Sequence, residues 1–316
     1  MARNWEDTFR RFSKTTSDAE DEKCERVVRM VRMAVAESPA LQSHTVRVFP
    51  QGSYRNLTNA RLASDVDVCI FCTDTFFHNF DWADGFRKED VGIAPATYAY
   101  SQYKNDVQAA LEAKFGKTGV TRSNKAFDVH ENSCRVDADV VACFEQRYYT
   151  RRNYDGTFSY VTGTHFVADD GNHVENWPDQ NYANGVEKNN VTSRRFKLIT
   201  RALKQIRYEM KDLKMTVAQP IPSYLVECLL YNTPNDQFGH ARYEDDVRAA
   251  LDFLIFATAN SETCNKWLEE NEIKYLFHAT QPWTLIQVQA FLQSVWTYVE
   301  FDKVPIAEKR ISSFLW

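Results

Sequence analysis

The stretch FPQGSYRNLTNARLASDVDVCIF, residues 49–71, decides how this chain folds and which chemistry it can perform. Its end alternates in polarity and then becomes wholly apolar, which predicts a strand entering a core over residues 65–73. Successive side chains of a strand point to opposite faces, so Asp65 and Asp67 share one face. Their carboxylates can therefore bind the same ligand.

A glycine-containing turn precedes this strand. A short β-branched strand is predicted over Thr45–Pro50, and the turn residues Gln51-Gly52-Ser53 follow it. Because glycine has no side chain, the backbone N–H groups and the serine hydroxyl can approach a phosphate without a clash. The turn and the nearby carboxylates together indicate a site for a phosphorylated ligand.

A second strand with acidic residues is predicted over Cys134–Phe144, CRVDADVVACF. Asp137 and Asp139 lie on one face at a period of two, so strand geometry leaves either of them open as a third carboxylate. Three carboxylates form an oxygen cage of the kind that Mg²⁺ prefers, with room for substrate phosphates. Two such ions, about 3.5–4 Å apart, clamp the attacking and leaving oxygens of an in-line phosphoryl displacement.

The Gly-Ser pair, the eleven-residue spacer and the Asp-x-Asp at a strand start resemble the polymerase-β-type nucleotidyltransferase superfamily. Longer stretches resemble more narrowly the bacterial cGAS/DncV-like nucleotidyltransferases, which make cyclic di- or trinucleotide signals in antiphage defence. The resemblance spans about residues 45–232 and is carried by residues 49–71, RVDADVVACFE (135–145), NWPDQNYANGVEKNNVTSRRFKLITRALKQIR (176–207) and IPSYLVECLLYN (221–232).

The resemblance implies an α+β fold, in which a polymerase-β-like nucleotidyltransferase lobe with a mixed sheet packs on a mostly helical C-terminal lobe. We expect an N-terminal bracing helix within residues 1–40 and the catalytic lobe over residues 41–190. A helical lobe over residues 191–316 would close the active-site cleft.

The resemblance also assigns catalytic residues and a cofactor. The family's third aspartate precedes an apolar run that ends in glutamate, as Asp139 precedes the run to Glu145, which favours Asp139 over Asp137. Asp65 and Asp67 would bind two Mg²⁺ ions, for which Mn²⁺ can substitute, and Asp139 would bind the ion nearer the attacking hydroxyl. That 3′-hydroxyl (or 2′-hydroxyl) attacks an α-phosphate and expels pyrophosphate, and a second round closes the ring. A separate effector would read the cyclic product.

A basic helix is predicted to start after Thr192 or Ser193 and to end near residue 214. Lys197, Arg201, Lys204 and Lys211 recur on it at helical spacing and form one stripe. Such a stripe can hold a triphosphate tail, although a solvated charged face is the alternative interpretation.

The next predicted helix, Ser223–Tyr231, begins with a hydroxyl that can reach phosphate. The following Tyr224 can stack on a base, or it can be a core residue. The complete set of predicted nucleotide-binding residues is Gly52, Ser53, Arg201, Lys204, Ser223 and Tyr224.

The remaining chain is predicted to be mainly helical, with amphipathic patterns over residues 5–37, 98–115 and 241–300. Residues 147–190 are rich in Asn, Asp, Gly and Tyr, which predicts hairpins and long loops over the site. The expected core anchors of the C-terminal part are Trp267, Phe277, Trp283, Phe291 and Trp296.

Charge and composition restrict the partners. The 38 Lys and Arg residues against 43 Asp and Glu give 38 − 43 = −5, whereas proteins that hold long nucleic acid normally carry a basic excess. Nucleoside triphosphates need only a local basic patch.

The sequence also carries signals about location. The start lacks an apolar signal sequence, no run reaches membrane-spanning length, and the seven cysteines form no disulfide framework. Cys69 and Cys72 should point to opposite faces of their strand, which argues against a shared metal. We expect a cytoplasmic monomer that binds neither membranes nor long nucleic acid.

Two other functions are compatible with these features. A non-cyclising transferase could extend RNA or modify a protein, although the negative charge weighs against the RNA version. A catalytically silent nucleotide-binding sensor is the second alternative. It is disfavoured because a silent protein has no chemical need for the Gly-Ser pair, the Asp-x-Asp and the distal aspartate together.

Overall fold

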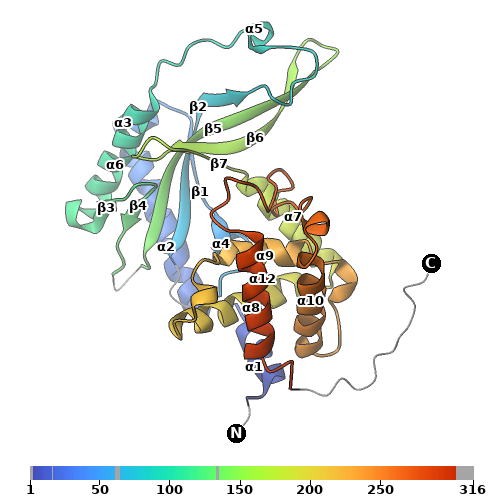
Figure 1. The fold of residues 1–316 in the computed structure, drawn as a ribbon. Coiled ribbons are helices and arrows are strands. Elements are labelled where there is room, and N and C mark those ends of the chain that lie inside the picture. Colours follow the sequence, from blue (N-terminus) through green and yellow to red (C-terminus); the bar gives the residue numbers. More distant parts are fainter. Residues whose placement is uncertain (1–2, 16, 61–64, 133–134, 304–316) are drawn as a thin grey trace. The chain divides into compact units, whose positions relative to one another are not determined.

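A computed structural model describes four stretches of the chain, residues 3–15, 17–60, 65–132 and 135–303 (Figure 1). The chain divides into two compact units. Thr15–Val186 form the sheet unit, and Met1–Lys14 with Glu187–Trp316 form the helical unit. Residues 1–40, which we expected to act as one bracing segment, are therefore shared between the two units.

A mixed seven-stranded sheet is the centre of the sheet unit (Figure 1). Its main path is β1-β2-β5-β4-β3, and β6 joins β5 to β7. Strands β2 and β5 are parallel, whereas the other pairs among the described residues are antiparallel. The strands are β1 (Val46–Pro50), β2 (Val66–Asn79), β3 (Val120–Arg122), β4 (Phe127–Val129), β5 (Ala138–Arg152), β6 (Phe158–Val167) and β7 (His173–Asn176).

Alternation along β2 and β5 separates two cores. Even-numbered residues, from Val66 to Cys72 and from Ala138 to Phe144, pack under helices α2 (Asp18–Glu37) and α6 (Tyr100–Phe115). These helices supply the apolar stripes that were predicted for residues 5–37 and 98–115. The α+β fold class is confirmed.

Odd-numbered residues of the same strands face the other side of the sheet. There Cys69 and Phe71 of β2 pack with Val141 and Cys143 of β5 in a smaller core. Cys69 and Cys72 thus lie in different cores, as predicted. The odd-numbered series starts with Asp67 on β2 and Asp139 on β5, so the carboxylates lie where this smaller core ends.

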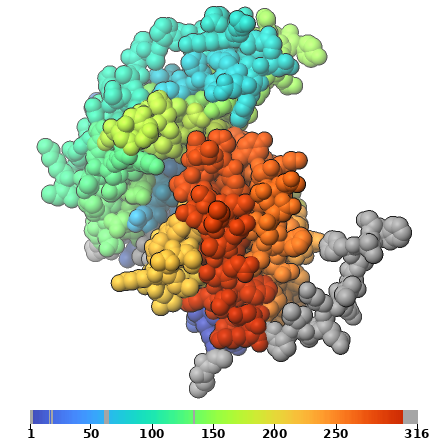
Figure 2. All heavy atoms as spheres, viewed as in Figure 1, coloured from blue at the N-terminus to red at the C-terminus, as the bar shows by residue number. Residues whose placement is uncertain are grey.

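The helical unit has its own apolar core. Its buried residues include Trp283 and Phe291, while Trp267, Phe277 and Trp296 pack against it partly buried, so all five expected anchors contribute. In Figure 2 the last two large helices, orange and red, form one outer face of this unit. The main helices are α1 (Trp5–Phe12), α8 (Arg195–Asp212), α9 (Ser223–Tyr231), α10 (Tyr243–Thr258) and α12 (Leu285–Tyr298).

Of the hairpins and long loops predicted for residues 147–190, the hairpins are confirmed, whereas the long loops are wrong for residues 178–190, which are helical. Strands β5 and β6 form a long hairpin, β7 follows, and residues Pro178–Val191 form helix α7. Proline at the first helical position and Asp179 in the first turn favour this helix start. The interior of this helix contains four asparagines and one glycine, which have weak helix propensity, and this concealed the helix from sequence reasoning.

The remaining elements are short, and they connect the larger helices and strands. Among the described residues, no helix is both long and apolar enough to cross a membrane. The short helices are α3 (Pro39–Gln42), α4 (Gly52–Arg55), α5 (Lys88–Val91) and α11 (Ser261–Cys264), and the 3₁₀ turns are Lys117–Gly119, Thr216–Ala218 and Asn235–Gln237.

Candidate active site

Strand pairing places two of the predicted carboxylates side by side. Asp67 on β2 and Asp139 on β5 are register partners in the parallel pair. Register partners project to the same face, and neighbouring strands lie about 4.7–4.9 Å apart. Asp65 directly precedes β2 and is exposed, whereas Asp67 and Asp139 are half-buried. The structure thus brings all three predicted residues to one end of the sheet.

Asp65 and Asp139 line a pocket of the sheet unit. Its volume is about 420 Å³, which lies within the range of small-ligand sites. Among the described residues that line it, five are polar or charged, and neither a lysine nor an arginine is present. The lining residues are Asp65, Asp128, Val129, His130, Asp137, Ala138 and Asp139.

Burial and the repulsion between neighbouring carboxylates together shift the pKa values in this pocket. Burial raises the pKa of Asp139, and the negative charges of Asp65, Asp128 and Asp137 raise it further. Partial burial raises the pKa of Asp65, with added repulsion from Asp137, Asp128 and Glu131. Each raised pKa means that the ionised carboxylate is disfavoured. A bound divalent cation would offset the repulsion between the carboxylates and so favour their ionised forms.

Asp137 and Asp139 differ in what their carboxylates do. The backbone N–H of Glu131 donates a hydrogen bond to Oδ1 of Asp137, at 2.5 Å. Asp137 also precedes strand β5, whereas Asp139 lies within it and pairs with Asp67. The geometry therefore favours Asp139 as the third carboxylate and gives Asp137 a role in holding the chain before β5.

Gly52 approaches the carboxylates closely. It is the first residue of helix α4, its φ is +63°, and a Cβ atom at this position would lie 2.1 Å from Oδ2 of Asp67. The backbone N–H of Gln51 donates to the carbonyl of Asp67 at 2.8 Å. Ser53 follows in α4 and is half-buried. The Gly-Ser turn is thus attached to the aspartate strand.

The residues present suit a hard divalent cation by their chemistry. Asp65 and Asp139 offer oxygen donors in one pocket, and Asp67 is the register partner of Asp139. The described lining holds no basic side chain that would offset the repulsion between the carboxylates. Among the described residues, no three His, Cys, Asp or Glu side chains already stand at metal-binding distances. Like-charged carboxylates separate when no cation is between them, so we expect them to move together on binding.

Sequence reasoning missed Asp128. It lies on the three-residue strand β4 and is the register partner of Asp139 in the antiparallel pair. A three-residue strand has no usable period, and the pairing joins residues whose register the sequence does not specify. The one available signal was a further aspartate shortly before the acidic strand.

Three residues of the predicted basic stripe, Lys197, Arg201 and Lys204, are buried in the helical unit, whereas Lys211 is half-buried. Lys204 is 2% exposed and forms an ion pair with Glu227, which is equally buried. Arg201 is 5% exposed, and its Nε donates to the carbonyl of Ser13 at 2.6 Å. The alternative of a solvated charged face is wrong for these two residues. Their contact with a nucleotide stays a prediction, because both have partners within the unit.

Ser223 and Tyr224 begin helix α9, as predicted. Both are half-buried, and the Tyr224 hydroxyl donates to Oε2 of Glu269 at 3.1 Å. Tyr224 also packs against the apolar core, in agreement with the alternative interpretation of this residue. The roles of Ser223 and Tyr224 toward a nucleotide remain predictions.

Comparison with known proteins adds independent evidence. A family model for the cGAS/DncV-like nucleotidyltransferase C-terminal helical domain matches residues 183–300. The cyclic dipyrimidine nucleotide synthase CdnE of Legionella pneumophila is 42% identical over 95% of this chain and 99% of that protein. The synthase of the same description from Cecembia lonarensis is 38% identical over 95% of this chain and 100% of that protein.

A solved structure extends the similarity to the fold. The CdnE c-UMP-AMP synthase of Rhodothermus marinus, with Apcpp and Upnpp, matches with a TM-score of 0.80 and 28% identity. The match covers 93% of this chain and 96% of that chain. The similarity therefore includes both the sheet unit and the helical unit.

Proposed function

We propose that this chain, which belongs to the cGAS/DncV-like nucleotidyltransferases, makes a cyclic dinucleotide from pyrimidine nucleoside triphosphates. Its relatives identify it as an enzyme of cyclic oligonucleotide synthesis. One observation carries the proposal for the site: Asp67 and Asp139 are register partners, with Asp65 directly before the same strand. Three oxygen donors at one sheet end suit the binding of divalent cations, which phosphoryl transfer requires.

The family resemblance suggests the catalytic roles. Asp65 and Asp67 would hold two Mg²⁺ ions, or Mn²⁺ ions, and Asp139 would hold the one nearer the attacking hydroxyl and assist removal of its proton. Such cations would neutralise charge on the phosphates and lower the pKa of the hydroxyl. The protein contributes mainly position and electrostatics, since phosphoryl transfer requires little covalent chemistry from side chains.

The Gly-Ser turn would position the triphosphate. Close approach of the Gly52 backbone to Asp67 brings unhindered backbone next to the carboxylates. Ser53 follows Gly52 in α4 and would offer its hydroxyl to the phosphates, and Ser223, at the start of α9, stays a predicted phosphate contact. Arg201 and Lys204, in the middle of α8, and Tyr224, in the first turn of α9, remain proposed nucleotide contacts.

Two successive transfers would give the ring. The first attack joins two nucleotides and releases pyrophosphate, which leaves a linear intermediate with one triphosphate. The second attack uses that triphosphate and the remaining free hydroxyl, and it releases a second pyrophosphate. Both steps have the same balance of bonds, so one set of carboxylates serves both.

The preference for pyrimidines is proposed from the relatives. Two proteins that align with 95% of this chain are named cyclic dipyrimidine nucleotide synthases. We further propose that the product is an antiphage signal read by a separate effector in the bacterial cytoplasm. The enzyme would act as a monomer, away from membranes and long nucleic acid.

Transfer of label from each nucleotide tests the pyrimidine preference. Each of the four ribonucleoside triphosphates, radiolabelled at the α-phosphate, is supplied in turn with the other three unlabelled, and the reaction is then treated with phosphatase. We expect protected label from UTP or CTP. Protected label from ATP and GTP alone would contradict the preference and leave the cyclase assignment intact.

A further inference from the structure

Three aspartates form a row across three neighbouring strands. Asp139 on the central strand β5 is the register partner of Asp67 on β2 and of Asp128 on β4. Register partners share a face of the sheet, so Asp128 lies on the side of Asp139 that is opposite to Asp67. Asp128 also lines the carboxylate pocket.

This arrangement is costly for the fold. Directly opposite residues of an antiparallel pair have Cβ atoms about 4.5–5.5 Å apart, and like charges at that separation destabilise a sheet. Asp65 and Asp137 add further negative charge to the same pocket. A purely structural site would gain stability if an uncharged residue replaced Asp128.

No structural task among the described residues accounts for the Asp128 carboxylate. Asp137, in the same pocket, accepts a backbone hydrogen bond from Glu131 and so has a structural use. Asp128 is the middle residue of β4 and the register partner of Asp139, so the two carboxylates lie on one face of the sheet. A cation bound beside Asp128 and Asp139 would neutralise their charges, which explains why two like-charged residues stand opposite each other at the end of the sheet.

We propose that Asp128 is a fourth carboxylate of the cation site, which holds the water shell of the ion bound at Asp139. The proposal rests on the cation-dependent function proposed above. Mg²⁺ keeps several water ligands in proteins, and carboxylates that bind those waters fix the position of the ion. Asp128 would therefore act as a positioning residue, because it acts through the ion and its waters.

Binding of Mn²⁺ alone, followed by electron paramagnetic resonance of the free ion, tests this role without turnover. We expect Asp128→Asn to weaken Mn²⁺ binding about tenfold, the lower end of the effect of outer-shell partners. Asp137→Asn removes the same charge from the same pocket and should weaken Mn²⁺ binding only about twofold. The reason is that solvent and salt screen the attraction between the ion and a carboxylate that does not contact its waters. The thermal midpoint without metal should rise by about 1–3 °C in Asp128→Asn, since repulsion is removed.

Weaker cation binding combined with higher stability is the pattern that supports the proposal. Equal losses of Mn²⁺ affinity in the two variants would overturn it, because the effect would then be general charge. A lowered thermal midpoint in Asp128→Asn would also overturn it, because the residue would then be structural. A wild-type protein that binds no Mn²⁺ would instead overturn the proposed cation site itself, which separates the two failures.

Discussion

Gly52 and Asp67 are so close that no side chain fits between them. A Cβ atom on Gly52 would lie 2.1 Å from Oδ2 of Asp67 and 3.0 Å from its carboxyl carbon. The backbone of Gly52 also has a φ of +63°, a region that side chains other than glycine rarely adopt. The Gly-Ser turn therefore determines where the Asp67 carboxylate can lie.

The substitution Gly52→Ala should displace the Asp67 carboxylate and lower kcat about 100-fold, the effect expected for a displacement of about 1 Å in an active site. The added methyl group must move either the carboxylate or the turn. Measurement of kcat with saturating nucleotides checks this result.

Gly85→Ala is the matched control for this substitution. Gly85 has a similar φ of +75°, but an added Cβ would meet nothing within 4 Å. We expect Gly85→Ala to lose a little stability, about 1–2 kcal/mol, and to keep its activity. Equal activity losses in both variants would show that backbone strain, not the clash with Asp67, is responsible.

Lys204 and Glu227 should stabilise the helical unit only as a pair. Each side chain is 2% exposed, so Lys204→Met leaves a buried carboxylate without its ion-pair partner. Breaking a buried pair in this way costs about 3–5 kcal/mol of unfolding free energy. We expect Lys204→Met/Glu227→Leu to recover most of that loss, as measured by chemical denaturation. A double variant as unstable as the single one would contradict this account of the pair.

The same double variant tests whether Lys204 contacts the nucleotide. If the lysine binds a triphosphate, the KM for nucleotides should rise about tenfold, since a charged hydrogen bond contributes about 1.5–3 kcal/mol. We expect that rise in a variant of normal stability. An unchanged KM would restrict Lys204 to packing and would remove it from the nucleotide site.

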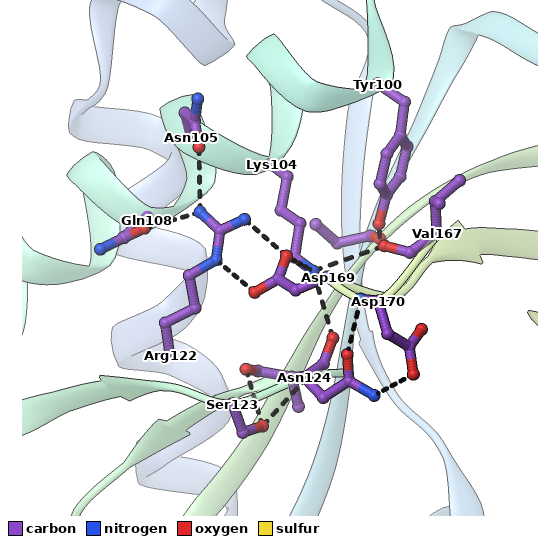
Figure 3. Close-up of polar contacts among 12 residues, drawn as sticks. Tyr100, Lys104, Asn105, Gln108, Arg122, Ser123, Asn124, Val167, Asp169 and Asp170 are labelled. Atoms are coloured by element: carbon purple, nitrogen blue, oxygen red, sulfur yellow. Dashed lines mark hydrogen bonds and ion pairs between the residues drawn. The ribbon is translucent and has the colours of Figure 1, made fainter. Parts of the chain in front are cut away.

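Asp169 should hold helix α6 to the strands of the sheet unit. It accepts a hydrogen bond from Lys104 at 2.7 Å and two from Arg122 at 2.6 and 2.7 Å (Figure 3). The Lys104 side chain is 4% exposed, so Asp169→Asn leaves a buried ammonium with weaker partners. We expect the free energy of unfolding at pH 7 to fall by about 1–2 kcal/mol. The effect is this small because Asp169 itself is 37% exposed, so solvent screens its charge. Chemical denaturation measures it.

The stability contributed by Asp169 should depend on pH with a known sign. Hydrogen bonds from Arg122 and Lys104 lower the pKa of Asp169 below its ordinary value. A carboxyl with a lowered pKa stabilises the fold above its unfolded pKa of about 3.9, and the stabilisation is lost as the pH falls below it. The difference in free energy of unfolding between wild type and Asp169→Asn should therefore have its full value at pH 7 and should become smaller below about pH 4. A difference that grows on acidification would contradict this account.

Much of the fold was predictable because its elements have clear hydrophobic periods. The apolar runs after Asp65 and Asp139 identified β2 and β5, and helix Ser223–Tyr231 matches its prediction residue for residue. Period-two alternation also predicted correctly that Cys69 and Cys72 point to different cores. These features depend on local sequence, which explains the agreement.

Features that depend on pairing between distant segments were not predictable. The registers of Asp67 with Asp139 and of Asp128 with Asp139 are set by tertiary packing of separate strands. Helix α7 was missed because packing outweighs the weak helix propensity of its asparagines. The partners of Lys204 and Arg201 were missed because a charged stripe on a helix does not reveal whether carboxylates are buried opposite it.

The most direct test of the central claim is the identity of the product. The pure protein is incubated with all four ribonucleoside triphosphates and Mg²⁺ or Mn²⁺, treated with phosphatase, and analysed by mass spectrometry beside the Asp65→Asn/Asp67→Asn variant. We predict a phosphatase-resistant mass of a cyclic dinucleotide that contains pyrimidines, present for the wild type and absent for the variant. Linear dinucleotides that lose their terminal phosphates to the phosphatase, with no cyclic mass beside them, would contradict the proposal of ring closure. The same cyclic mass from the variant would contradict the proposal that these aspartates catalyse it.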